Sequence, residues 1–587
     1  MIKRKGNVYK LDTPSLTLLV RAEGAAEYLY FGEKLSLPGS DYARLFSPGK
    51  GTEPLFSCGE KGLVRCETAE KEVVSPFVFQ RAKPAEKPVA APLPSSFSDS
   101  GERSLCLEFA EEGAKLKLFV YCTAFDDCDA VVFSARLYNG GRKEVRVRRL
   151  DSLALALPEG RLSSEGFLSC SEGKNGAYAF CLVGGAAPGK AEISGDVLRF
   201  GGGEFFPDKS LFPGESLLSP EAAVSFARDK EGAARALRGF FARRVLRGRR
   251  KDREFPVAAQ LSTGGEEEIV KAAEAGAEVL LFPCRPDNPE SVSRLAEVAE
   301  RVRAAGLKFG LDVCLQRAYP GDAVLGKHPE FAVGAAGEDG GISLDFSEPR
   351  MQKYAVRVLS AAIAASRAAC VKWRFPEDFG DAEGVCAALA RLTEKFPSVL
   401  WMGEGCAAPG LLAFFRKILV RTMPGISENA LPLSCLSVPL SAGGSALFGT
   451  PFLGAFDGGR EETKAFLSLY AEFRRAAEGE LYPLGGEAEG ICAAAPGGAC
   501  MLALVRAGKP GARVVLKGAE KGALYAVKGF CGGAESAEAV FSGELLTGAG
   551  FPLYALFPDG GKGEIVVAAE KAGKNRPRRR ETAEENA

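Results

Sequence analysis

The stretch Ile342–Arg374, ISLDFSEPRMQKYAVRVLSAAIAASRAACVKWR, indicates the fold of the central part of the chain. Ser343 to Asp345 read as the end of a β-strand, and a Ser-Glu-Pro turn follows them. Apolar residues then recur at helical spacing after Pro349, a residue favoured in the first turn of a helix. The apolar run Cys370–Trp373 predicts a second strand. Strand, helix and strand form a βαβ unit, and enzymes built from such units place their chemistry at the carboxyl ends of the strands.

The same alternation extends over residues 255–479. Stretches with helical periodicity separate six runs of strand character: Val257–Leu261, Val279–Phe282, Leu307–Cys314, Val371–Trp373, Val399–Met402 and Ile418–Arg421. Repeated βα units over about 200 residues fit a (β/α)8 barrel. Arg374 is therefore the residue that one barrel strand is expected to present at its carboxyl end.

The flanking sequence has other periodicities. Short alternating strands broken by Gly, Pro and Asn-Gly come first and predict a β-sandwich. Helical spacing then follows Ser219-Pro220-Glu221, with Pro220 expected at the first helical position. The predicted fold class is a multidomain β + (β/α)8 + β chain, divided into an N-terminal β-sandwich domain at 1–218, a helical linker at 219–254, a central TIM barrel at 255–479, a small C-terminal antiparallel β-domain at 480–570 and a disordered tail at 571–587.

The overall composition excludes several classes of protein. The length of 587 residues predicts about three domains. Lys plus Arg and Asp plus Glu number 75 each, so nothing global indicates a nucleic-acid or membrane-surface partner. No apolar run approaches the length of a transmembrane helix, and the N-terminus lacks the features of a signal peptide.

Cysteine and histidine usage narrows the chemistry. The 16 cysteines are scattered without a CxxC pair, which fits buried free thiols better than a disulfide framework or a zinc site. We therefore expect a protein of the reducing cytoplasm, without a cofactor or a metal. His328 is the one histidine, so a His-based metal site or a Ser-His-Asp triad would have to include it.

Segments along nearly the whole chain resemble the motifs of a known family. They are Tyr28-Leu29-Tyr30-Phe31-Gly32, Arg136-Leu137-Tyr138-Asn139-Gly140, Leu218-Ser219-Pro220-Glu221-Ala222, Phe309-Gly310-Leu311, His328-Pro329-Glu330-Phe331, Leu344-Asp345-Phe346-Ser347-Glu348-Pro349, Lys372-Trp373 and Glu404-Gly405-Cys406. These segments resemble the LYFG, R-x-x-N-x-G, SPEA, FGLW, HPDW, LDLSRP, KWD and E-x-C motifs of glycoside hydrolase family 36, the bacterial α-galactosidases.

The resemblance implies retaining hydrolysis of α-galactosides by two Asp residues, a nucleophile and an acid/base. Their carboxyl groups would need to lie about 5 Å apart. The family's nucleophile directly follows Lys-Trp, and Arg374 has that position, 29 residues after Asp345 as in the family. Arginine stays protonated and presents only donors, so it cannot attack an anomeric carbon. Its charge about 4 Å from an oxocarbenium-like transition state would oppose that state by roughly 4 kcal/mol at an effective dielectric of 20.

The resemblance also implies the remaining positions of the site. The acid/base position falls on Glu428, 22 residues after Cys406, so a carboxylate is kept there. Pro283-Cys284 replaces a pair of Asp residues in the family, and a site that loses its hydrogen-bonding groups binds galactose poorly. The positions implied for substrate binding are Lys372, Trp373, Glu404, Cys406, Asp312 and Asp345.

Three functions stay open on the sequence alone, and with them the question whether the chain is an enzyme. The first is a pseudoenzyme whose barrel binds a galactoside-like carbohydrate or serves assembly. The second is an active glycosidase for an anionic sugar, with Arg374 and Lys372 as binding groups and Glu428 and Glu404 as the first catalytic candidates. The third is a structural role as a homo-oligomer. An internal ion pair of Arg374 with Glu404 or Glu428 is the alternative to a ligand at this arginine.

Overall fold

The computed structural model describes most of the chain. The described residues are 2–23, 25–36, 62–89, 93–156, 160–165, 168–184, 190–194, 197–201, 209–246, 254–376, 382–405, 409–421, 431–454, 461–506, 509, 511–531, 534–558 and 564–572.

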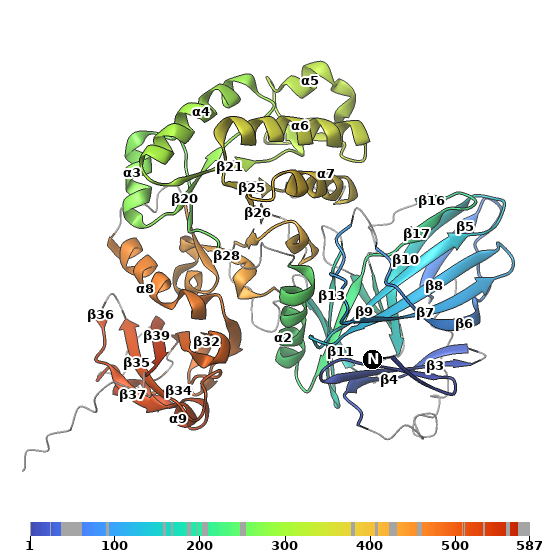
Figure 1. Ribbon diagram of the computed structural model, residues 1–587, viewed down its shortest axis with the longest axis horizontal. Coiled ribbons are helices and arrows are strands. Elements are labelled where there is room, and N and C mark those ends of the chain that lie inside the picture. Colours follow the sequence, from blue (N-terminus) through green and yellow to red (C-terminus); the bar gives the residue numbers. More distant parts are fainter. Residues whose placement is uncertain are drawn as a thin grey trace, which may run out of the picture.

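Antiparallel sheets form the N-terminal part, at the right of Figure 1, as the alternating sequence predicted. The four-stranded sheet contains β1 (Ile2–Lys5), β2 (Val8–Asp12), β3 (Leu16–Glu23) and β4 (Ala25–Glu33). The nine-stranded sheet contains β6 (Val78–Ala85), β7 (Glu102–Glu111), β8 (Leu116–Phe125), β9 (Val131–Asn139), β11 (Gly160–Glu165), β12 (Leu168–Gly173), β13 (Gly176–Leu182), β17 (Ser216–Leu218) and β18 (Ala222–Ala227). The five-stranded sheet contains β5 (Val64–Thr68), β10 (Val145–Ala156), β14 (Lys190–Ser194), β15 (Val197–Gly201) and β16 (Lys209–Leu211). Apolar side chains from all three sheets share one core.

The prediction of a helix beginning at Pro220 was wrong. The residues that follow form β18, which pairs with β13 and β9 and is buried except at its last residue. Burial between neighbouring strands outweighs the local helix signal here. Helix α2 (Lys230–Phe240) begins later, where the Asp229 carboxylate accepts a hydrogen bond from the Gly232 N–H, and it continues as the π-helix η2 (Phe241–Val245).

The central part is a closed barrel of parallel strands, at the upper left of Figure 1. Its strands in order are β19 (Ala258–Gln260), β20 (Val279–Pro283), β21 (Lys308–Val313), β25 (Cys370–Arg374), β26 (Leu400–Glu404), β27 (Lys417–Leu419), β28 (Leu436–Pro439) and β29 (Thr450–Leu453). The six predicted strands are all present. The sequence did not predict β28 and β29, because a segment rich in Gly, Pro and Ser surrounds them.

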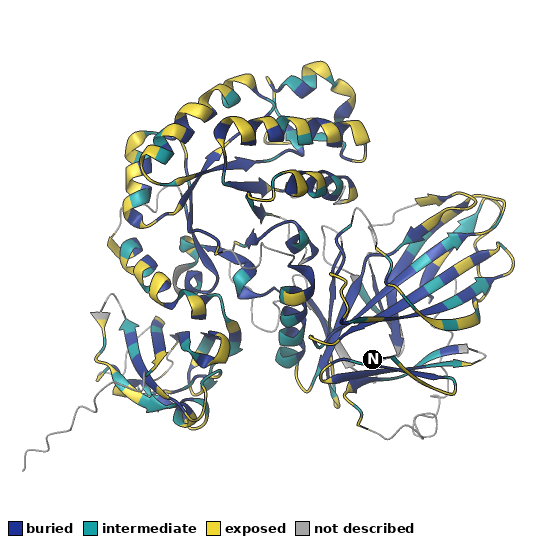
Figure 2. Ribbon diagram, viewed as in Figure 1, coloured by how far each residue is buried: buried dark blue, intermediate teal, exposed yellow. Residues whose placement is uncertain are grey.

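Helices cover the outside of the barrel strands. They are α3 (Glu266–Ala275), α4 (Pro289–Ala304), α6 (Pro349–Ser366), α7 (Ala382–Lys395) and α8 (Glu461–Ala477). Figure 2 shows their outer faces exposed and the strands beneath them buried. Pro349 lies in the first turn of α6, as predicted, after the N-cap residue Glu348.

The strand predicted before α6 exists, but it is not a barrel strand. It is β24 (Ile342–Leu344), which pairs antiparallel with β22 (Arg317–Ala318) and β23 (Ala332–Val333) in a separate small sheet. This sheet and the short helix α5 (Ala323–Lys327) form an excursion between β21 and α6. The barrel neighbours of β25 are therefore β21 and β26.

The C-terminal part returns to antiparallel sheets, at the lower left of Figure 1, as predicted. One sheet contains β30 (Glu480–Pro483), β32 (Glu489–Ala494), β33 (Cys500–Arg506), β35 (Leu524–Cys531), β36 (Ala534–Glu535), β37 (Ala539–Ser542) and β39 (Glu564–Lys571). A smaller one contains β31 (Gly485–Gly486), β34 (Arg513–Val515) and β38 (Phe551–Pro552), and α9 (Gly543–Thr547) lies between β37 and β38 in the chain. The predicted tail lies outside the described residues from position 573 on, and the domain boundaries stay predictions.

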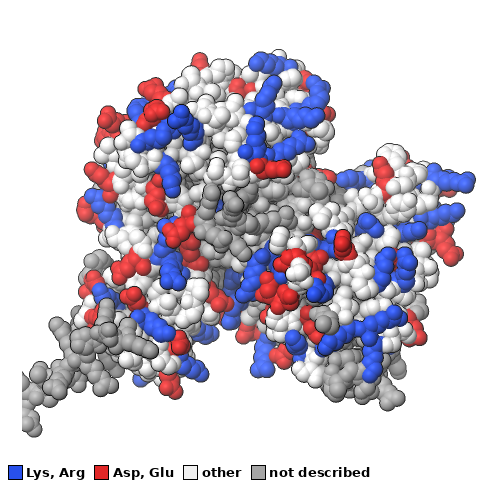
Figure 3. All heavy atoms as spheres, viewed as in Figure 1, with Lys and Arg blue, Asp and Glu red and all other residues white. Residues whose placement is uncertain are grey.

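The surface of the molecule carries both signs of charge. Figure 3 shows basic and acidic side chains interspersed over one face. Within the described ranges, no helix has the length and apolar character needed to cross a membrane. The described cysteines are free thiols, and none of them is exposed.

Candidate functional site

Alternate residues of each barrel strand point toward the barrel axis, because successive side chains of a strand point to opposite faces. On β25, Cys370 belongs to the apolar cluster inside the barrel, together with Met402 of β26 and Phe452 of β29. Lys372 and Arg374 have the same parity as Cys370. Both side chains therefore point inward, Lys372 at mid-depth and Arg374 at the carboxyl end of the strand.

The register of the barrel brings four inward-pointing charged residues together. Asp312 on β21 stands opposite Lys372, and Arg374 stands opposite Glu404 on β26. Lys372 Nζ lies 2.9 Å from Glu404 Oε2 and 3.4 Å from Asp312 Oδ2. Arg374 Nε donates a hydrogen bond to Asp312 Oδ1 at 2.8 Å. These four residues, here called the charged cluster, link the carboxyl ends of three adjacent strands.

Burial differs within the charged cluster. The side chains of Lys372 and Asp312 are 5% and 6% exposed, whereas those of Glu404 and Arg374 are 35% and 48% exposed. Burial lowers the pKa of Arg374, but the Asp312 carboxylate outweighs this and raises that pKa above its ordinary value. Arg374 is therefore always charged. In the described part of the chain its Nε alone has a partner, so its two terminal nitrogens can donate to a ligand.

Arg374 and Glu404 line a pocket of about 780 Å³ at the carboxyl ends of the strands. This volume is within the range of roughly 300–1,000 Å³ that is typical of small-molecule sites. Its other charged and polar wall residues include Arg317, Tyr319, Asp339 and Arg421, and its apolar ones include Phe375, Leu419 and Phe452. The described walls thus carry three arginines against two carboxylates. Within the described ranges, no group of three or more potential metal ligands occurs.

The sequence did not predict four of these wall residues. Arg317, Tyr319 and Asp339 belong to the excursion between β21 and α6, where Arg317 Nη1 lies 3.4 Å from Asp339 Oδ1 and the Tyr319 hydroxyl donates to Asp339 Oδ2 at 3.0 Å. No periodic pattern in that segment indicates its path. Arg421 closely follows the end of β27, so the rule that functional side chains follow barrel strands could have found it.

Trp373 and Asp345, implied as substrate-binding residues, do not line the pocket. Trp373 is fully buried among the helices, because its parity is opposite to that of Arg374, and its Nε1 donates to Gln316 Oε1 at 2.9 Å. Asp345 accepts hydrogen bonds from the N–H and the hydroxyl of Ser347 in the turn before α6. These contacts give both residues structural positions.

The remaining implied residues outside the pocket wall divide into two groups. Lys372 and Asp312 are buried beside Arg374 and Glu404, without reaching the wall of the pocket. Cys406 and Glu428 lie outside the described residues, and their roles stay predictions. The sequence predicts an internal ion pair of Arg374 with Glu404 or Glu428. Among the described residues Arg374 pairs with Asp312, and Glu404 pairs with Lys372.

Comparisons with known proteins agree with this architecture. Residues 24–166 match the model of the glycosyl hydrolase family 36 N-terminal domain. Probable alpha-galactosidase G of Emericella nidulans is 21% identical over 457 residues, which cover 60% of this chain and 63% of that protein. Two solved structures from Geobacillus stearothermophilus have the same fold. The GH36 alpha-galactosidase AgaB has a TM-score of 0.81 at 16% identity, with 97% of this chain and 100% of that chain covered. A variant of AgaA in complex with stachyose has a TM-score of 0.78 at 17% identity, with 96% and 100% covered.

The barrel, its flanking antiparallel sheets and the pocket at the strand ends define a multidomain barrel protein, and its fold is that of the solved GH36 alpha-galactosidase structures. The family model, the α-galactosidase relatives and the solved structures together support membership of the chain in glycoside hydrolase family 36. The alignments span only 63% and 58% of the first two curated relatives, so the activity of those proteins is not carried over to this chain as a finding.

Proposed function

We propose that the barrel pocket binds a carbohydrate and does not hydrolyse α-galactosides by the retaining mechanism. The observation that carries this proposal is Arg374, whose inward position at the end of β25 is the nucleophile position implied by the family resemblance. A retaining glycosidase needs a free carboxylate there. The nearest described carboxylates, Asp312 and Glu404, are both paired with cations. The charge of Arg374 also opposes the positive charge of the transition state.

Carbohydrate binding is supported by the relatives of the chain. Variants of AgaA from Geobacillus stearothermophilus have been solved in complex with stachyose and with raffinose. The pocket of this chain is large enough for a sugar residue at about 780 Å³.

The charges of the pocket favour an acidic saccharide as the ligand. The guanidinium fork of Arg374 has two terminal nitrogens without described partners, and such a fork matches a carboxylate or a phosphate in geometry and charge. Arg317 and Arg421 add positive charge to the same walls. A uronic acid or a sugar phosphate is therefore the class of ligand that the proposal names.

Two measurements on the full chain test this proposal. Isothermal titration calorimetry with galacturonate, galactose 1-phosphate and galactose should detect binding of an acidic sugar and weaker binding of galactose. Arg374→Ala should weaken the acidic sugar by about tenfold or more, whereas Arg350→Ala, at an exposed arginine outside the pocket, should not. An assay with an aryl α-galactoside should show no turnover, and turnover by the unmodified chain would overturn the proposal.

We also propose that the protein resides in a reducing cytoplasm and forms a homo-oligomer. The free thiols support the first, since the described cysteines are all at least partly buried and unbridged. Exposed apolar side chains of the N-terminal part, such as Val74 before β6 and Val78 on β6, support the second. Light scattering on the reduced protein measures the mass, and a monomer at micromolar concentration would contradict an oligomer.

A further inference from the structure

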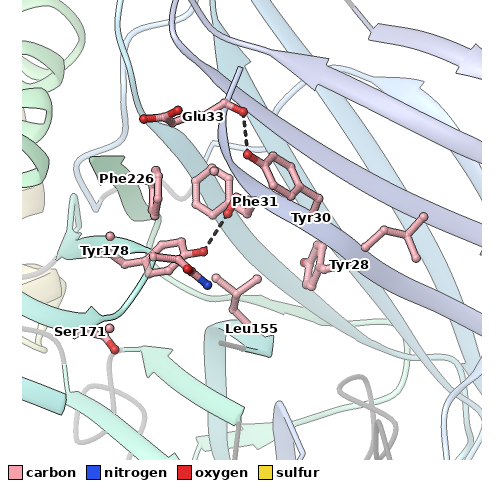
Figure 4. Close-up of a pocket in the computed structure, with 13 residues that line it drawn as sticks. Tyr28, Tyr30, Phe31, Glu33, Leu155, Ser171, Tyr178 and Phe226 are labelled. Carbon is pink, nitrogen blue, oxygen red and sulfur yellow. Dashed lines mark hydrogen bonds between the residues drawn. The ribbon is translucent and has the colours of Figure 1, made fainter. Parts of the chain in front are cut away.

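The N-terminal sheets contain a second pocket, of about 460 Å³, that the proposed barrel function does not use. It lies between the edge strand β4 and the strands β12, β13 and β18 of the nine-stranded sheet. Figure 4 shows Tyr28, Tyr30 and Phe31 on one side and Tyr178 and Phe226 on the other. The first three belong to a segment that carries the family resemblance, yet the barrel gives them no role.

The aromatic walls of this pocket are held in fixed positions. The ring centroid of Tyr178 lies 4.9 Å from that of Phe226 and 5.9 Å from that of Phe31. The Tyr178 hydroxyl donates to the Phe31 carbonyl at 2.7 Å, and the Tyr30 hydroxyl donates to the Glu33 carbonyl at 2.8 Å, which are the dashed lines of Figure 4. The bond to Phe31 links β4 to β13 at this pocket. The pocket volume of about 460 Å³ suits a small ligand.

Two polar side chains of this pocket can form hydrogen bonds with a ligand. Ser171 on β12 lines the pocket, and its hydroxyl is not sealed inside the sheet, so it can bond to a ligand there. Asn175 adds an exposed amide at the rim. Glu33, the one charged residue among the wall residues that the structure describes, is paired with Arg228 at 3.0 Å.

We propose that this pocket binds a neutral saccharide unit, independently of the barrel. A pyranose ring has apolar C–H faces that suit aromatic walls, and hydroxyl groups at its edge that suit Ser171 and Asn175. The described walls offer no basic side chain to an acidic ligand, and the Glu33 carboxylate already has a cation. A volume of about 460 Å³ holds one or two sugar rings.

Calorimetric titration of the full chain with galactose, glucose and raffinose tests this site. At least one of these sugars should bind, and Tyr30→Ala and Ser171→Ala should each weaken it by about tenfold. Phe212→Ala is the matched control, because Phe212 is an aromatic residue of the N-terminal part that directly follows β16, 52% exposed and outside the pocket. This control and Arg374→Ala should leave the affinity unchanged.

Two results would overturn the proposal. One is the absence of binding by all three neutral sugars. The other is neutral-sugar binding that Arg374→Ala abolishes and that folded Tyr30→Ala and Ser171→Ala retain, because that pattern assigns the sugar to the barrel. Urea unfolding of each variant establishes that it is folded. Failure of the acidic sugars to bind would refute the barrel proposal and leave this one untouched, so the two can be told apart.

Discussion

Replacing Asp312 by Asn perturbs the charged cluster with almost no change of shape. The change removes a negative charge that lies 2.8 Å from Arg374 Nε and 3.4 Å from Lys372 Nζ. Lys372 keeps Glu404 as a partner at 2.9 Å, whereas Arg374 loses the one ion pair that the described residues give it. We therefore expect opposite effects of Asp312→Asn on the stability of the chain and on the binding of an acidic sugar.

The size of each effect follows from the exposure and spacing of these groups. Removing one partner of a buried ion pair costs about 3–5 kcal/mol. We expect a smaller loss of about 2 kcal/mol in the free energy of unfolding, because Arg374 is half exposed and Asn still accepts a hydrogen bond. An anion about 7 Å from position 312 gains about 2.4 kcal/mol at an effective dielectric of 20 when the carboxylate is removed. Screening by salt reduces this gain, so the affinity for galacturonate should rise about tenfold.

Urea unfolding measures the first effect and calorimetry with galacturonate measures the second. Glu330→Gln is the matched control, because Glu330 is a carboxylate outside the pocket that pairs with the exposed Arg350. The control should change neither quantity. Weaker galacturonate binding by folded Asp312→Asn would refute the reasoning that Asp312 competes with a ligand for Arg374.

Three further predictions concern the nucleophile position, a buried ion pair and the thiols. Arg374→Asp should give no turnover of an aryl α-galactoside and should lower the free energy of unfolding in urea, because the new carboxylate faces Asp312; measurable turnover would contradict this. Glu221→Ala should lower that free energy by about 3–5 kcal/mol, because Lys87 Nζ lies 2.7 Å from Glu221 and both side chains are buried; a loss below about 1 kcal/mol would argue against it. Burial raises the pKa of several thiols from 9.0 to about 12, namely those of Cys122, Cys284, Cys370 and Cys492. In the unfolded chain these thiols ionise at a lower pH than in the folded chain. Their contribution to the free energy of unfolding is therefore complete below pH 9 and is lost toward pH 12, by up to about 1.4 kcal/mol per pH unit for each thiol. Urea unfolding at neutral pH and at pH about 10 measures this loss, and equal stability at both would contradict it.

The barrel was predictable because its strand and helix periods alternate over a long stretch. For two short segments, the local sequence pattern predicted the wrong structure. Ile342–Leu344 has three residues, too few for their pattern to distinguish a barrel strand from one of a small excursion sheet. The segment after Pro220 has an N-terminal helix signal, yet its apolar residues fill the gap between β13 and β9. In both cases contacts with distant strands decide the structure, and the local sequence does not contain them.

The candidate site was likewise predictable only in part. The position of Arg374 at the end of a barrel strand followed from counting along the sequence. Its partner did not, because Asp312 becomes its neighbour only when β21 and β25 are adjacent in the barrel. That adjacency depends on β24 lying outside the barrel. Trp373 lies outside the pocket for a simpler reason, since a residue next to an inward-pointing one on a strand must point outward.

The two proposed sites lie in different parts of the chain that share one hydrophobic core. Phe125 and Cys170 of the N-terminal sheets belong to the same buried cluster as Val371 of the barrel, together with Leu237 and Phe240 of α2. Because this core is continuous, we expect the two parts to unfold in one transition. A ligand at about 100 times its dissociation constant adds about 2.7 kcal/mol to the stability of the state that binds it.

An acidic sugar in the barrel and a neutral sugar in the N-terminal pocket should therefore stabilise the chain additively, because the described walls of the two pockets share no residue. Saturating with both should add about 5.4 kcal/mol to the free energy of unfolding in urea. A sum no larger than either effect alone would mean that the sugars compete for one site. Two separate transitions, each shifted by one sugar, would mean that the core shared through α2 does not couple the sheets to the barrel.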